Sequence, residues 1–114
     1  MTNTETAFLF PLLPGKRQAL EQFVEDLTHK WQSEHDRNHY SILHESWFLQ
    51  TTGLGDIVIV YLVTTDPYEV FADLAISQEP FQVWFRANVL ELTGMNLAMV
   101  PPFSMPQNIF HRTR

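Results

Sequence analysis

The sequence predicts an α+β fold, in which an antiparallel sheet carries helices on one face and a second copy of the chain on the other. One supporting observation is the order of strand-like and helix-like segments, which is β-α-β-β-α-β over residues 6–100. Another is the unbroken apolar run at residues 57–63. A strand with one face in water alternates apolar and polar residues, so this one is expected to be covered on both faces. One layer of helices covers a single face, which leaves the other for a symmetry mate.

Composition limits the chain to one well-packed domain that binds neither nucleic acid nor membrane. Its 114 residues are 45% hydrophobic and 13% aromatic, which suits a single core and excludes disorder. A net charge of −6, with only seven Lys and Arg, excludes a basic face for phosphates. The longest apolar run is far below the ~20 residues that span a membrane, and the first residues do not resemble a signal peptide. The absence of cysteine excludes disulfides and thiol chemistry and suits a reducing cytoplasm, where we expect the protein.

The first third of the chain predicts a strand followed by a helix. Residues 6–13 are apolar and aromatic, and the turn signal Pro14-Gly15 closes them. Pro11 has no amide hydrogen to donate, so it is expected near the end of this strand or at a bulge. From Lys16 the apolar residues recur at helical spacing, which predicts a helix that ends around residues 35–38. Its apolar face consists of Leu20, Phe23, Val24, Leu27 and Trp31.

The middle of the chain predicts a β-hairpin. Residues 40–51 form its first strand and residues 56–64 its second, joined by a glycine-bearing loop of five residues, 52–56. β-Branched side chains dominate the second strand, and such side chains suit a pleated surface.

Two further helices follow the hairpin. Asp66 is placed to cap the first of them, which begins at Pro67. Residues 77–80 end it and offer a new cap and another early proline. The last helix is expected to end at Gly94, because glycine accepts the left-handed closing conformation. Its core-facing side carries Phe81, Trp84 and Phe85.

The end of the chain predicts a fourth strand and a tail. Residues 95–100 form the strand, so the folded domain covers residues 6–100. Residues 101–114 are broken by prolines but carry four large apolar side chains. A tail meant only for solvent rarely contains so many, so we expect it to pack on the domain or on the partner subunit.

Four short motifs extend the fold prediction: Leu-Leu-Pro-Gly-Lys at 12–16, His-Glu-Ser-Trp-Phe-Leu at 44–49, Gly-Asp-Ile-Val-Ile-Val-Tyr at 55–61 and Ser-Gln-Glu-Pro at 77–80. With them, residues 6–100 resemble the dimeric α+β-barrel superfamily, in which two ferredoxin-like subunits close their sheets face to face. The chain is most similar to a small uncharacterised branch. Relatives include cofactor-free monooxygenases, haem-handling enzymes, small-lactone isomerases and stress proteins. The resemblance therefore implies a homodimer and leaves the activity open.

The candidate site lies on the predicted hairpin. A five-residue loop pairs Trp47 with Tyr61 and Glu45 with Val63. On this register, one face carries polar groups and is assigned to the barrel interior, while the aliphatic face is assigned to the helices. The interior set is Glu45, Trp47, Ile57, Ile59 and Tyr61, and the helix-covered set is Val58, Val60 and Leu62. Ligand contacts are assigned to Trp47, Ile59, Phe8 and Phe10.

Glu45, His44 and Tyr61 are the candidate catalytic residues. Desolvation would raise the pKa of Glu45 and suit it to act as a base, with the Tyr61 hydroxyl hydrogen-bonding a substrate oxygen. A register slip of one residue exchanges Glu45 for His44, which then serves as a proton acceptor or an axial haem ligand. The structural alternative pairs Glu45 with Arg86, Lys16 or a partner-chain group and makes Tyr61 a filler of the dimer core.

No metal or cofactor is predicted. His35 and His39 stand four residues apart, a spacing that offers two imidazoles on one helix face. No third ligand is specified and the segment is polar, so a solvated helix end is the expected structure. The sequence also has no glycine-rich phosphate loop and no recognisable nucleophile motif.

The functional hypothesis is a homodimer that binds a small ligand or has a structural role. The alternative is a cofactor-independent monooxygenase or isomerase, acting on a small aromatic or enolisable compound in the barrel. A third hypothesis is an interaction module whose tail docks on another protein. A binding protein or an enzyme requires an interior cavity of roughly 300 Å³ or more, whereas a structural dimer is filled by its own aromatic side chains.

Overall fold

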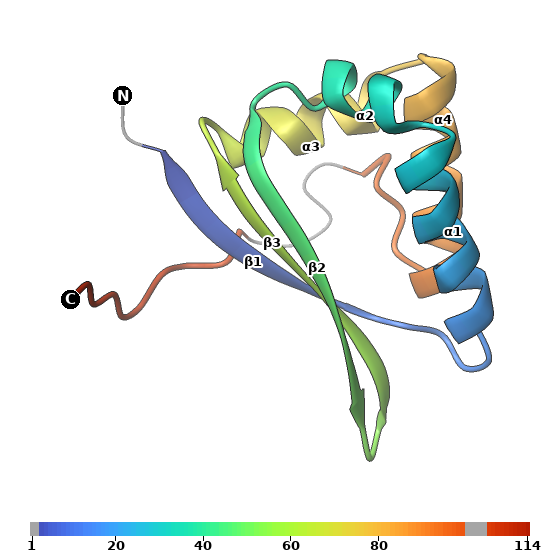
Figure 1. Cartoon of the computed structure of the whole chain (residues 1–114), viewed down its shortest axis with the longest axis horizontal. Coiled ribbons are helices and arrows are strands. Elements are labelled where there is room, and N and C mark those ends of the chain that lie inside the picture. The colour runs from blue at the N-terminus through green and yellow to red at the C-terminus, as the bar shows by residue number, and fades with distance from the viewer. Residues whose placement is uncertain (1–2, 100–104) are drawn as a thin grey trace.

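Three strands and four helices make up the described part of the chain, residues 3–99 and 105–114 of a computed structural model (Figure 1). The strands are β1 (Thr4–Pro11), β2 (Ile42–Thr52) and β3 (Gly55–Thr64). The helices are α1 (Arg17–His29), α2 (Gln32–Asn38), α3 (Pro67–Ile76) and α4 (Pro80–Thr93). The predicted α+β class and the predicted hairpin are confirmed. Within the described residues, no helix is long and apolar enough to cross a membrane.

The strands form one antiparallel sheet in the order β1-β3-β2, with β3 in the centre. The helices lie on one side of this sheet (Figure 1). Along β1 the side chains alternate, with Thr6, Phe8 and Phe10 buried beneath the helices and their neighbours exposed. Such alternation is typical of an antiparallel strand with one covered face. We call the side that faces the helices the covered face and the other side the open face.

The predicted fourth strand is not present at residues 95–99, and Val100 lies outside the described residues. The Asn96 side chain accepts a hydrogen bond from the Ala98 amide, and the Asn96 carbonyl accepts one from Met99, so the chain turns here. Leu97 is buried in the core. Competition from this local turn and from burial of Leu97 explains why the segment does not extend along the sheet. The three-stranded arrangement remains compatible with a ferredoxin-like fold.

The helix ends follow the predicted chemistry. The Asp66 carboxylate accepts hydrogen bonds from the amides of Tyr68 and Glu69, and Pro67 occupies the first turn of α3. Gly94 closes α4 with a φ of 78°. The helix predicted to run to residues 35–38 is instead two helices, because the amides of Lys30 and Trp31 both bond to the Asp26 carbonyl and end α1.

The core lies between the covered face and the helices. The expected aromatic stripe of α4 is confirmed, with Phe81 and Phe85 buried and Trp84 packed against them. On α1 the predicted face is largely confirmed, but Val24 is 39% exposed. The other buried members are Phe8, Phe10, Leu12, Leu20, Phe23, Val58, Leu62, Phe71, Leu74, Val89, Leu92 and Leu97.

The predicted hairpin register is wrong by one residue. Thr52 pairs with Gly55, so the loop has two residues rather than five. The Thr52 hydroxyl stabilises this tight turn by accepting from the Leu54 amide and donating to the Gly55 carbonyl. Trp47 therefore pairs with Val60, and the side chains from His44 to Thr52 lie on the face opposite to the predicted one. A register shift between Ile42 and His44 keeps Ile42 on the covered face.

Candidate functional site

The register divides the predicted site between the two faces of the sheet. Glu45 and Trp47 lie on the covered face, because they pair with Leu62 and Val60. Their predicted partner Tyr61 lies on the open face. There it pairs with Ser46, so the predicted cluster of Glu45, Trp47 and Tyr61 is not formed.

His44 and Tyr61 come together on the open face instead, with ring centroids 5.7 Å apart. The His44 ring is also 3.1 Å from the Ser46 hydroxyl oxygen. Ile59 shares this face, where it lies half-buried between Leu9 and Phe48. These residues therefore form part of a surface and do not line the interior of the described chain.

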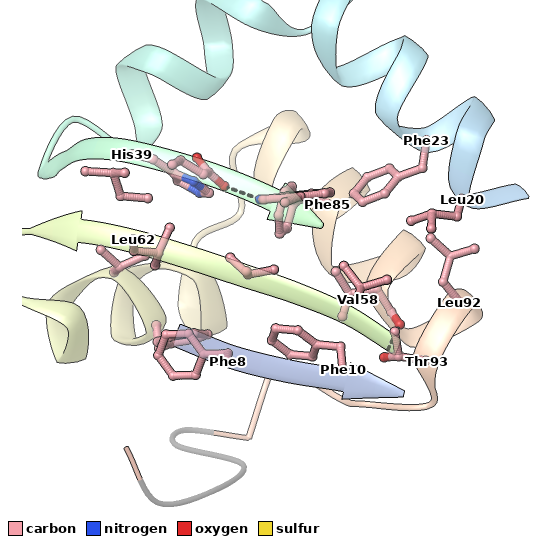
Figure 2. A pocket seen from close by; sticks show the side chains of 17 residues that line it. Phe8, Phe10, Leu20, Phe23, His39, Val58, Leu62, Phe85, Leu92 and Thr93 are labelled. Carbon is pink, nitrogen blue, oxygen red and sulfur yellow. Dashed lines mark hydrogen bonds between the residues drawn. The ribbon is translucent and has the colours of Figure 1, made fainter. Parts of the chain in front are cut away.

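An apolar cavity of about 80 Å³ lies between the covered face and the helices (Figure 2). Figure 2 shows Phe8 and Phe10 of β1 on one side of it, with Phe23 of α1 and Phe85 of α4 on the other. Trp47 also lines the cavity. Three of the four predicted ligand-contacting residues thus surround one space, although that space lies beneath the helices rather than in a barrel interior.

Glu45 forms the polar end of this cavity. Its two carboxylate oxygens accept separate hydrogen bonds, one from His35 Nε2 at 2.8 Å and one from Trp47 Nε1 at 2.7 Å. Burial by itself raises the pKa of Glu45, but the hydrogen bond and the attraction from His35, together with the Trp47 bond, lower it below its ordinary value. Glu45 is therefore ionised at neutral pH, and its observed partner is His35 rather than Arg86 or Lys16.

His39 lies beside this pair and also lines the cavity. Its side chain is buried, and its Nε2 donates to the Gln82 side-chain oxygen at 2.8 Å. Burial, followed by repulsion from His35, lowers the pKa of His39 from 6.5 to about 4. His39 is therefore neutral at pH 7, and the bond to Gln82 places its proton on Nε2.

The solvated helix end predicted for His35 and His39 is wrong. The two rings lie 4.7 Å apart and both contact the aromatic residues of α4. The His35 ring is 5.6 Å from Phe81, and the His39 ring is 5.5 Å from Phe85. In the sequence, the spacing of four residues between His35 and His39 was the one sign that the two rings lie together. Their burial comes from α4, more than 40 positions further along the chain, and such a contact leaves no local pattern.

The Glu45 carboxylate separates the cavity from the surface. It lines the cavity and also two surface hollows, of about 360 Å³ and 470 Å³. The bonds from His35 and Trp47 hold the carboxylate in this position. Two buried nitrogen atoms nearby, His35 Nδ1 and Trp31 Nε1, have no hydrogen-bond partner within the described part of the chain. A molecule that reaches the cavity from either hollow must displace this closure.

The arrangement favours binding of a ligand that donates a hydrogen bond to Glu45. Among residues 3–99 and 105–114, no group of three His, Cys, Asp or Glu side chains is placed to hold a metal ion. What the site offers is an apolar wall, one ionised carboxylate and one neutral imidazole. Such a combination suits a small apolar molecule that carries one hydrogen-bond donor.

Comparison with known proteins found no matching family model, no matching curated protein and no matching solved structure.

Proposed function

We propose that the protein is a homodimer that binds a small, largely apolar ligand inside each subunit. The observation that carries this proposal is the apolar cavity with the ionised Glu45 at one end. Burying a charge costs desolvation free energy, so a well-packed apolar residue would serve a purely structural role at least as well. A carboxylate at the edge of a cavity instead offers an apolar ligand one hydrogen-bond acceptor, which fixes how the ligand lies in the cavity.

The cavity volume restricts the ligand. The observed space of about 80 Å³ is well below the roughly 300 Å³ of an ordinary ligand pocket. It also falls below the ~150 Å³ of an engineered cavity that holds benzene. A ligand of benzene size therefore needs the closure at Glu45 to move, which adds space from the neighbouring hollow of about 360 Å³.

The second subunit is proposed to cover the open face. Across its centre run Leu9, Ile59 and Phe48, one from each strand. Leu9 is 62% exposed and Phe48 is 57% exposed in the single chain. A sheet with apolar residues on both faces is stable in water when the second face is buried, and an identical subunit offers a self-complementary partner.

A cofactor-independent enzyme is the second candidate, with Glu45 as the base. A general base works best when its pKa lies near the operating pH, and the surroundings of Glu45 lower its pKa instead. Both carboxylate oxygens are also engaged by donors. Catalysis would first require His35 to release the carboxylate, so binding is the better supported function.

Thermal unfolding with benzene and phenol tests the ligand proposal. We expect both to raise the melting temperature, and phenol more, because its hydroxyl can donate to Glu45 in place of His35. Val58→Phe fills the cavity from β3 and should abolish both shifts. Its control is Val83→Phe, at a position on α4 that is 40% exposed and does not line the cavity. The proposal would be refuted if benzene and phenol raised the melting temperatures of Val58→Phe and Val83→Phe equally, or did not raise that of the wild-type chain.

A further inference from the structure

We infer that the C-terminal tail, residues 105–114, forms part of the dimer interface by packing on the partner subunit. This inference rests on the proposed dimer and adds the segment that completes it. The tail carries two of the most exposed large apolar side chains of the described residues, Ile109 and Phe110.

The tail passes from the helix side of the sheet to the open side. Met105 packs against the hydrophobic core. Residues 106–108 then lie beside β1, where they and Tyr61 border a hollow of about 300 Å³. The C-terminus lies on the opposite side of the sheet from α1 and α4 (Figure 1). A second copy seated on the open face would therefore meet this end of the chain.

Two large apolar side chains occupy the tail at this point. Ile109 is 89% exposed and Phe110 is 80% exposed. The Asn108 side chain accepts from the Phe110 amide, which gives this stretch a defined local turn. The chain's own domain does not cover these two side chains, whereas a partner on the open face is positioned to do so.

The area of the open face supports the same conclusion. β1 has eight residues and the sheet has three strands, so at ~3.3 Å per residue and ~4.8 Å between strands the face measures about 400 Å² in projection. A stable interface buries about 800 Å² per partner. Met105 and residues 106–108 contact their own subunit. Residues 109–114, which span ~20 Å when extended, are therefore the part of the tail that adds to this area.

Charge distribution favours the partner chain as the occupant. All 13 acidic residues of the sequence lie at or before Glu91. After it, the only charged side chains are Arg112 and Arg114. The tail therefore combines an apolar pair with a basic end, whereas the rest of the chain is strongly acidic. Two copies can exchange these ends, so that each basic end meets the net negative charge of the other copy.

Sedimentation equilibrium of the purified full-length chain tests the inference. A chain with Ile109→Ser and Phe110→Ser should dimerise at least tenfold more weakly than the wild type. Arg112→Gln with Arg114→Gln should also weaken the dimer, and by less at high salt. The matched control is Leu54→Ser, which removes an equally exposed apolar side chain from the tip of the hairpin. It should leave the dimer affinity unchanged.

The outcomes separate this inference from the proposal on which it rests. Phe48→Asp places a charge at the centre of the open face and should dissociate the dimer. If Phe48→Asp dissociates it while the serine double variant matches the wild type, the tail is not part of the interface and the face-to-face dimer stands. A wild-type chain that is monomeric throughout the concentration range would overturn both. Because these side chains are exposed, all variants should keep the wild-type circular dichroism spectrum.

Discussion

Acidification should destabilise this protein through His39. Its pKa is about 4 in the folded chain and about 6.5 in an unfolded chain, so between these values the unfolded state binds more protons. A group with a lowered folded pKa loses its stabilising effect as the pH falls through that window. For these two values, lowering the pH from 7.5 to 5 costs about 2 kcal/mol of unfolding free energy, since each pKa unit corresponds to ~1.4 kcal/mol.

Urea unfolding at pH 7.5 and pH 5, at one protein concentration, measures this loss. His39→Gln keeps an amide that can donate to Gln82 but does not titrate, so it should reduce the difference between the two pH values by about 2 kcal/mol. The control is His111→Gln, at the exposed end of the chain, which should retain the wild-type difference. At pH 5 Glu45 is still ionised, because its pKa is below the ordinary value, so the stability lost between the two pH values does not come from protonation of Glu45.

A wild-type chain whose stability is equal at both pH values would refute this explanation. So would a His39→Gln chain that keeps the full pH dependence. If His39→Gln does not fold, an NMR titration of the wild-type histidines gives the answer directly. A His39 midpoint close to 6.5 would show that the ring is not held in its buried, neutral form.

Four further substitutions test the packing and the polar contacts by urea unfolding. Glu45→Gln should cost about 2 kcal/mol at pH 7, because one of two donors loses its acceptor, and less toward pH 3, where the stabilising charge of Glu45 is lost by protonation; an unchanged stability at pH 7 would show that the bonds contribute nothing. Leu74→Ala should cost about 2–5 kcal/mol, since the side chain is only 2% exposed; a cost under ~1 kcal/mol would place Leu74 outside the core. Asp66→Ala should cost about 1 kcal/mol through loss of the α3 cap, and a neutral result would contradict the capping role. Arg17→Gln should leave the stability nearly unchanged despite its bonds to Asp56, because the pair is exposed to solvent; a clear loss of stability would show that the hairpin depends on it.

Local signals in the sequence were sufficient for most of the fold. The cap at Asp66, the closing glycine at Gly94 and the central apolar strand all depend on residues that are close in the chain. The predicted fourth strand is wrong because five of the six residues 95–100 are apolar, and such a segment does not distinguish a strand from a turn that buries one side chain.

The candidate site depended on a distinction that the sequence does not make. Thr52 and Gly55 are compatible with a loop of five residues or a turn of two, and this difference decides which face carries Glu45. Glu45 and Trp47 were identified, but their partner His35 was not. His35 is buried by aromatic residues of α4, and such a long-range contact has no signature in a polar segment.

Native mass spectrometry of the wild-type chain, with and without phenol, tests both the proposed dimer and its ligand site in one measurement. We expect an ion at twice the chain mass that takes up one phenol per subunit. The Val58→Phe chain should give the same dimer without the added mass. A bare monomer, or a dimer that takes up phenol equally with the cavity filled, would contradict the proposed function.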